Sequence, residues 1–112
     1  MVDALNDEEI EYLKLVAFVF LRHGKWEKAR VLYDLLWEIA PEDLQVLKGL
    51  GLACLETGRL TQALEYVNRW IEQSGLKEEI KEAKILRARI LWHIKKAEEA
   101  GADMDPERNK RL

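Results

Sequence analysis

Residues 13–29 read LKLVAFVFLRHGKWEKA, and residues 47–63 read LKGLGLACLETGRLTQA. Aligned with each other, the two stretches are identical at five positions that all lie 34 residues apart: Leu13/Leu47, Lys14/Lys48, Leu21/Leu55, Gly24/Gly58 and Ala29/Ala63. Other positions keep their character, large and apolar at Val16/Leu50 and small at Ala17/Gly51. Such a period is typical of a helix–turn–helix unit that stacks into a solenoid. The repeat therefore predicts an all-α fold.

Turn residues set the expected ends of the helices. Gly24 and Gly58 fall where a first helix must stop, a place that often needs positive φ and so favours glycine. Pro41 ends the second helix, because proline cannot continue the hydrogen-bonded ladder, and Ser74-Gly75 takes the same place one repeat later. We expect helices over residues 6–23, 26–40, 42–57, 60–74 and 77–100.

The expected helices form a single domain over residues 1–100, with repeats at about 10–43 and 44–77 and a long capping helix at about 77–100. Glu42 and Asp43 are expected to supply negative charge to the first turn of the third helix, which suits the helix dipole. Residues 101–112 are polar and carry Asp105-Pro106, so we expect a flexible tail.

The fifth helix departs from the repeat. Continuing the 34-residue register puts Lys81, Lys84 and Ile85 at positions that pack internally in the first two repeats, which lysines do not suit. An apolar stripe returns in the stretch ILRARILWHI, through Ile85, Leu86, Ala88, Ile90, Leu91, Trp92 and Ile94. We expect this stripe to cover the exposed edge of the second repeat, because solenoids need capping elements at their ends.

The composition argues against several classes of protein. The chain has 112 residues, a hydrophobic content of 48% and a formal net charge of -3, which suits one compact domain and gives no basic field for nucleic acid. Its longest apolar run, the seven residues 15–21, is far shorter than the roughly 20 that span a bilayer. Met1 is followed by acidic residues rather than a basic signal region. Because Cys54 is the only cysteine, no intrachain disulfide can form, and we expect a cytoplasmic protein.

Residues with catalytic or metal-binding chemistry are scattered. The glycines form no phosphate-binding loop, and His23 and His93 have no metal-binding spacing around them. Cys54 falls at a packing position, where a small apolar residue is expected rather than a nucleophile. The tryptophans at 26, 37 and 70 are expected to pack in the core. We therefore expect no enzyme activity, no metal and no cofactor.

The repeat resembles the tetratricopeptide repeat. In that family the first helix of each unit carries large, large, small and large side chains, and the corresponding residues here are Leu13, Val16, Ala17, Phe20 and then Leu47, Leu50, Gly51, Cys54. The turn glycine, the aromatic, the alanine and the closing proline of the family fall on Gly24, Trp26, Ala29 and Pro41. The resemblance implies a short solenoid of two repeats plus a capping helix, with a protein partner.

Members of that family bind peptides on the concave face, through side chains of the first helices that internal packing leaves free. Carried over position by position, the groove-facing residues are Glu11, Lys14, Phe18 and Leu21 in the first repeat and Gln45, Lys48, Leu52 and Leu55 in the second. The resemblance implies a partner-binding groove with a floor of the four apolar residues, Phe18, Leu21, Leu52 and Leu55. Lys14 and Lys48 are expected on one rim.

Two kinds of partner can be compared. Repeats that hold the carboxylate of an acidic C-terminal tail resemble one another in using asparagines and lysines, and this chain has Phe18 and Leu52 where an asparagine is required. An amphipathic helix or an extended apolar segment suits the groove better. Alternatively, Phe18 and Leu21 pack on the fifth helix or on a second copy of the chain. Leu15 and Val19 have no assigned neighbour.

A narrower resemblance runs from about Leu5 to Ile71, through LNDEEIEYLKL, GKWEKARVLYDLLWEIAPEDL and ALEYVNRWI. These stretches are similar to the small, YscY-like chaperones of bacterial type III secretion. The resemblance implies a cytoplasmic bacterial chaperone that forms a heterodimer with a small helical secretion substrate or export component and keeps it ready for export. The alternative is a self-associating adaptor or assembly factor with no role in secretion.

Overall fold

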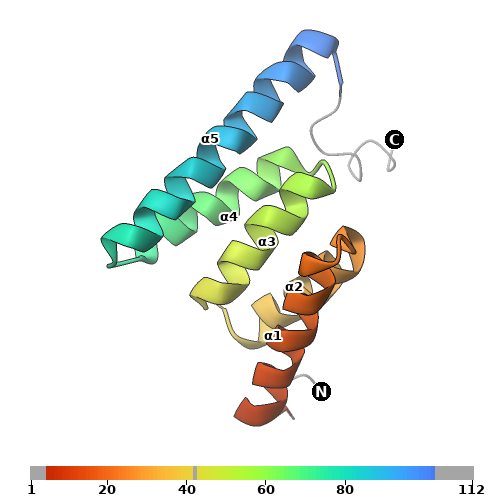
Figure 1. Ribbon diagram of the computed structural model, residues 1–112, viewed down its shortest axis with the longest axis vertical. Coiled ribbons are helices and arrows are strands. Elements are labelled where there is room, and N and C mark those ends of the chain that lie inside the picture. The colour runs from red at the N-terminus through yellow and green to blue at the C-terminus, as the bar shows by residue number, and fades with distance from the viewer. Residues whose placement is uncertain (1–4, 42, 103–112) are drawn as a thin grey trace.

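The computed structural model describes residues 5–41 and 43–102, which form five α-helices (Figure 1). The helices are α1 (Asp7–Arg22), α2 (Trp26–Ile39), α3 (Leu44–Glu56), α4 (Leu60–Gln73) and α5 (Lys77–Ala100). Each observed end lies within two residues of the end that the turn residues predict. The predicted all-α solenoid, with two helical pairs and a long terminal helix, is confirmed.

The turns after α1 and α3 have the same geometry. Gly24 has a φ of 73° and Gly58 a φ of 78°, as their places in the repeat predicted. One residue further on, the backbone N–H of Lys25 donates to the carbonyl oxygen of Phe20, and that of Arg59 to Cys54, both at 2.8 Å. These bonds close the last turn of each helix while the chain reverses direction. The turn therefore makes antiparallel neighbours of α1 and α2, and of α3 and α4.

Acidic and amide side chains cap the starts of α1 and α3. The side chain of Asn6 accepts a hydrogen bond from the backbone of Glu9, whose own carboxylate accepts one from the backbone of Asn6. Asp43 accepts bonds from the N–H groups of Gln45 and Val46. Asp43 thus supplies negative charge to the first turn of α3, as predicted, although it does so from the residue before the helix and not from within it. A short acidic side chain satisfies more free N–H groups from the position just before the helix.

The core consists of two clusters that meet at α3. One joins α1, α2 and α3, and the other joins α3, α4 and α5. Eight of the 13 residues of α3 are buried, which makes it the central helix of the molecule. Four small residues of the repeat are buried: Ala17, Ala29, Gly51 and Ala63. Trp70 is also fully buried, while Trp26 and Trp37 pack at the edges of the clusters.

Only part of the predicted stripe on α5 packs against the repeats. Ile90 is fully buried, and Leu86 and Ile94 pack at the edge of the α3–α4–α5 cluster. The other four members of the stripe, Ile85, Ala88, Leu91 and Trp92, are exposed, which corrects the prediction. The seven residues cover too wide an arc of the helix for one contact, since a packing face recurs every three or four residues. The buried face is instead completed by Ala83 and Ala97.

The burial of Cys54 should make its thiol slow to react. Its side chain is 1% exposed, and this burial raises the pKa of the thiol to about 12. Because the thiolate is the reactive form, we expect a disulfide reagent at pH 8 to label the folded protein at least ~100-fold more slowly than the denatured protein. Absorbance of the released thiol in buffer and in guanidinium measures both rates. Equal rates would show that the packing around α3 opens readily.

Two expectations concern the ends of the chain and the membrane. None of the described helices is both long enough and apolar enough to cross a bilayer. α5 ends at Ala100 and is capped by Gly101, which has a φ of 70°. A flexible tail was predicted for residues 101–112, of which residues 103–112 lie outside the described part of the chain.

Candidate functional site

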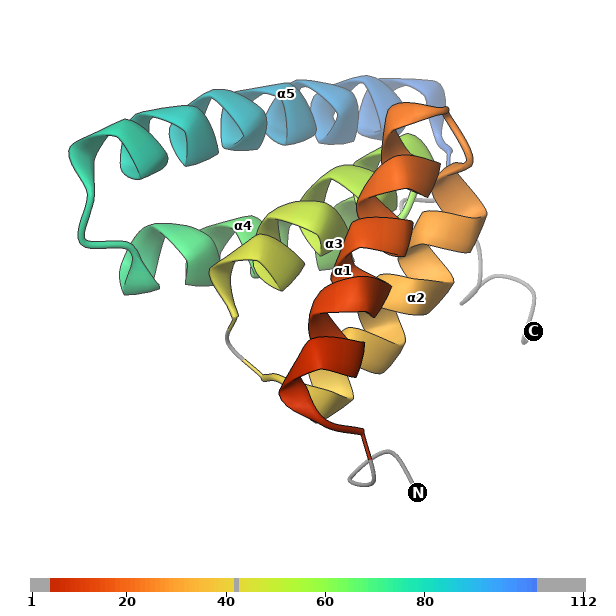
Figure 2. The same ribbon diagram turned by 60° about the horizontal axis from the view of Figure 1, so that its bottom comes forward.

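A groove of about 710 Å³ lies between α1, α3 and α5. Figures 1 and 2 show that α3 stands between the other two helices. Side chains of α1 and α5 form the walls of the groove. α1 contributes Phe18 and Leu15, and α5 contributes Ile85 and Leu86. The floor includes Leu52 and Gly49 of α3, with Tyr33 of α2 and Trp70 of α4 below them. The groove is therefore mainly apolar.

The structure brings together most of the residues that were predicted to face a partner. Seven of the eight line the groove: Glu11, Lys14, Phe18, Leu21, Gln45, Lys48 and Leu52. Phe18 is the most accessible of the apolar ones, with 47% of its surface exposed. Leu52 is half-buried. Their role in binding stays a prediction, but they share one surface.

Leu55 was wrongly assigned to this surface. It is buried in the cluster between α3, α4 and α5, outside the groove. The reason is its position one helical turn after Gly51, which faces α4 so closely that a Cβ there would lie 2.8 Å from Val67. Residues four apart share a helix face, so Leu55 must also point towards α4. Its counterpart Leu21 follows Ala17 in the same way and is only 8% exposed, so it lines the groove as a core residue.

The two lysines of the predicted rim are held by carboxylates of the chain itself. Lys14 donates hydrogen bonds to Glu11 and Asp43, both at 2.9 Å. Burial alone would lower the pKa of Lys14, but these two bonds raise it above its usual value. The ammonium of Lys48 lies 3.6 Å from Glu79 and 3.7 Å from Glu82. Neither lysine presents an unpaired charge to the groove.

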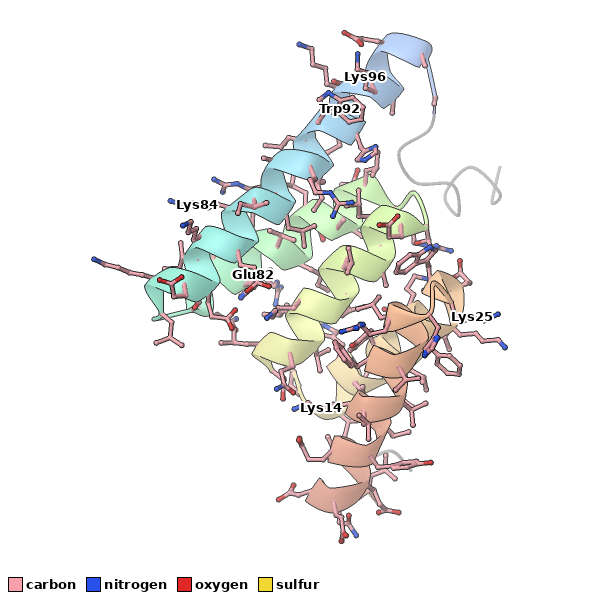
Figure 3. All side chains as sticks on the ribbon, viewed as in Figure 1. Lys14, Lys25, Glu82, Lys84, Trp92 and Lys96 are labelled. Carbon is pink, nitrogen blue, oxygen red and sulfur yellow. The ribbon has the colours of Figure 1, made fainter. Side chains whose placement is uncertain are left out.

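The wall contributed by α5 was not predicted, although the repeat contains the information. Glu82 lies 34 residues after Lys48, and Leu86 lies 34 residues after Leu52, so both continue the groove-facing positions of the first two repeats. Glu82 lies on the side of α5 that faces α3, whereas Lys84 points away from it (Figure 3). Extending the groove-facing positions, rather than the packing positions, would have found this wall.

The groove also carries charge at one end and a buried hydroxyl at its floor. Arg89 of α5 lies 3.5 Å from Glu56 of α3 and lines the groove. Burial raises the pKa of Tyr33 to about 12, so its phenol stays neutral at physiological pH. Mixed charges at the rim and a neutral apolar floor suit a segment with an apolar face and polar edges.

The residues considered for metal binding lie in different places. Cys54 is in the core, His23 caps the end of α1, and His93 is exposed on α5. Within residues 5–41 and 43–102, no group of three or more His, Cys, Asp or Glu side chains is arranged to hold a metal ion.

Comparison with known proteins identifies the repeat. No curated protein and no solved structure matches the chain. The family model of the tetratricopeptide repeat matches residues 20–85, which run from the last turn of α1 into α5. This stretch is more than half of the chain and holds both turn glycines and the central helix. The chain thus belongs to the tetratricopeptide repeat family, whose members are scaffolds for protein–protein interaction.

Proposed function

We propose that the groove between α1, α3 and α5 binds an amphipathic helix of a partner protein. The observation that carries this proposal is the engagement of both rim lysines by Glu11, Asp43, Glu79 and Glu82. A partner held by its carboxylate would have to displace these ion pairs. A partner held by apolar side chains would leave them in place and cover the exposed apolar walls.

The walls are suited to a helix rather than a short terminal peptide. Apolar side chains face the groove from all three helices, at Phe18 on α1, Leu52 on α3 and Leu86 on α5. An amphipathic helix presents apolar residues three, four and seven positions apart, so that one face can contact several walls at once. Covering this surface removes apolar area from water, which stabilises the complex by about 25 cal/mol for each Å².

Substitution of Phe18 tests the groove. We expect Phe18→Asp to weaken binding of a helical peptide, selected against the wild-type protein from a displayed library, by at least ~100-fold, because a carboxylate would be buried against apolar atoms. Fluorescence anisotropy measures the affinity. The matched control is Val31→Asp on α2, which is also exposed and lies outside the groove, and which should bind normally. Equal affinity of both variants for the peptide would place binding elsewhere.

We propose further that the protein is a cytoplasmic chaperone of bacterial type III secretion. The support is the resemblance of residues 5–71 to the small chaperones of that system, together with a groove that can shield one helix. Co-expression with the products of adjacent genes should give a soluble 1:1 complex with a secreted component, and Phe18→Asp should abolish it. If the adjacent products remain soluble and unbound, the chaperone role is excluded while the peptide experiment still tests the groove.

A further inference from the structure

Exposed apolar side chains are concentrated on the first and last helices. Among the described residues, nine large apolar side chains are exposed, and seven of them belong to α1 or α5. The seven are Tyr12, Leu15, Phe18, Val19, Ile85, Leu91 and Trp92. The ends of a solenoid normally carry a polar outer face, because no further repeat covers them. These ends therefore need an explanation beyond capping.

On α1, the exposed residues occupy positions that a neighbouring helix covers in α3. Tyr12, Leu15 and Val19 are the members of this set, and with Glu8 they form what we call the α1 stripe. The positions 34 residues later are Val46, Gly49 and Ala53, which are buried beside α2. The α1 stripe is thus the face on which a preceding helix would pack.

α5 leaves exposed the face that corresponds to the side of α3 covered by α4. Leu47, Leu50, Gly51 and Cys54 of α3 are buried in the repeat, and the residues 34 positions later are Lys81, Lys84, Ile85 and Ala88. All four are exposed, since no second helix follows α5 in the described chain. A shallow recess runs along this face, which we call the α5 seat, lined by Lys77, Ile80, Lys81, Lys84, Ile85 and Ala88.

The two faces have opposite charge. Glu8 of the stripe lies in the acidic first turn of α1, which also holds Asp7 and Glu9, and the described part of α1 has no basic residue before position 14. The α5 seat holds Lys77, Lys81 and Lys84, which form no ion pair with any residue in 5–41 or 43–102. Complementary charge steers association and selects the register of a contact.

We propose that the α1 stripe of one copy of this chain packs into the α5 seat of a second copy. The apolar residues of the stripe would meet Ile80, Ile85 and Ala88, and its acidic end would meet the seat lysines. Because the stripe and the seat are different surfaces, the contact is heterologous. Each added copy leaves one stripe and one seat open, so association continues beyond two copies unless the rotation between copies closes a ring.

The wild-type protein should self-associate in a manner that depends on concentration and salt. We expect sedimentation equilibrium at low ionic strength to give a mean mass above that of the monomer, and increasing with concentration. Raising sodium chloride from 50 to 500 mM should weaken association by roughly five-fold or more, because salt screens the contact between acidic stripe and basic seat.

A mixing experiment tests the pairing of unlike surfaces. One variant, Glu8→Gln/Tyr12→Gln/Val19→Gln, alters only the stripe, and another, Lys81→Gln/Lys84→Gln/Ala88→Gln, alters only the seat. Leu15 of the stripe and Ile85 of the seat also line the groove, but none of these six substituted residues does, so both variants keep the groove lining intact. Each variant alone should be monomeric. An equimolar mixture should form 1:1 pairs and nothing larger, because one intact stripe meets one intact seat.

Several results would overturn the proposal. A variant that still dimerises alone would indicate a symmetric contact through its intact surface. A wild-type protein that stays monomeric at the highest concentration would exclude the contact. If that monomer sediments with phosphatidylserine vesicles and Lys81→Gln/Lys84→Gln/Ala88→Gln does not, the seat binds an anionic membrane surface instead of a second copy. Val31→Gln, on an exposed site outside both surfaces, should associate like the wild type. Circular dichroism of each variant must match the wild type.

Discussion

Replacing Gly49 by alanine should lower the free energy of unfolding by about 3 kcal/mol, at the upper end of the usual cost of overpacking a core. A Cβ at position 49 would lie 2.2 to 2.5 Å from three ring atoms of Tyr33. An aromatic ring cannot bend away from such a contact, so α2 and α3 must separate. Urea denaturation followed by circular dichroism measures the change.

Gly75 provides the matched control for this substitution. No heavy atom lies within 4 Å of a Cβ built there, and its φ is outside the left-handed region. Gly75→Ala should therefore change the free energy of unfolding by less than about 1 kcal/mol, in either direction. Combining Gly49→Ala with Tyr33→Leu should cost less than the sum of the two single changes, since the ring that clashes is removed. Strict additivity would exclude the contact as the cause.

Trp70→Ala should have the largest effect on stability, a loss of about 4 kcal/mol. The side chain is 1% exposed and lies between α3, α4 and α5. Its indole N–H donates to the carboxylate of Glu79 at 3.0 Å, and the ammonium of Lys48 lies 5.2 Å from the centre of its ring. Truncation to alanine removes the buried packing, the hydrogen bond to Glu79 and the contact with Lys48 at once. Because a domain of this size has a free energy of unfolding of only about 5 to 15 kcal/mol, the midpoint temperature of thermal unfolding should fall strongly.

Trp92 gives the comparison within the same chain. It is 56% exposed, so Trp92→Ala should change the free energy of unfolding by no more than about 0.5 kcal/mol. Trp70→Phe should lie between the two alanine variants, because it keeps apolar volume but loses the hydrogen bond to Glu79. If Trp70→Ala melts like the wild type, the packing of α5 on the second repeat is not as described.

The sequence predicts the helices well because their ends depend on local chemistry. Gly24 and Gly58 readily adopt a positive φ, and Pro41 cannot continue a helix. The end of each of these helices is therefore specified by a few residues of local sequence. The residues that are identical 34 positions apart then indicate that the pair α1–α2 stacks on the pair α3–α4. Local geometry and the repeat together were enough for the fold.

The groove was predicted less completely because it depends on which face of each helix meets a neighbour. Leu55 and Phe18 both looked available, yet only Phe18 reaches the groove, since the close approach of α3 to α4 turns Leu55 inwards. The pairing of Lys48 with Glu79 and Glu82 depends on the position of α5, which the packing positions of the repeat did not indicate and only the groove-facing positions continue. Long-range contacts of this kind are absent from any local pattern.

The position of α3 between the groove walls has a consequence for how the protein unfolds. α1 packs against α2 and α3, while α5 packs against α4 and α3, so the two ends of the described chain meet through the middle helix. In a structure built from neighbouring contacts, the terminal helices can open separately. A helix in the groove would touch both walls and couple their opening. A helix bound in the groove would then change the cooperativity of unfolding as well as its midpoint, because α1 and α5 would open together and not separately.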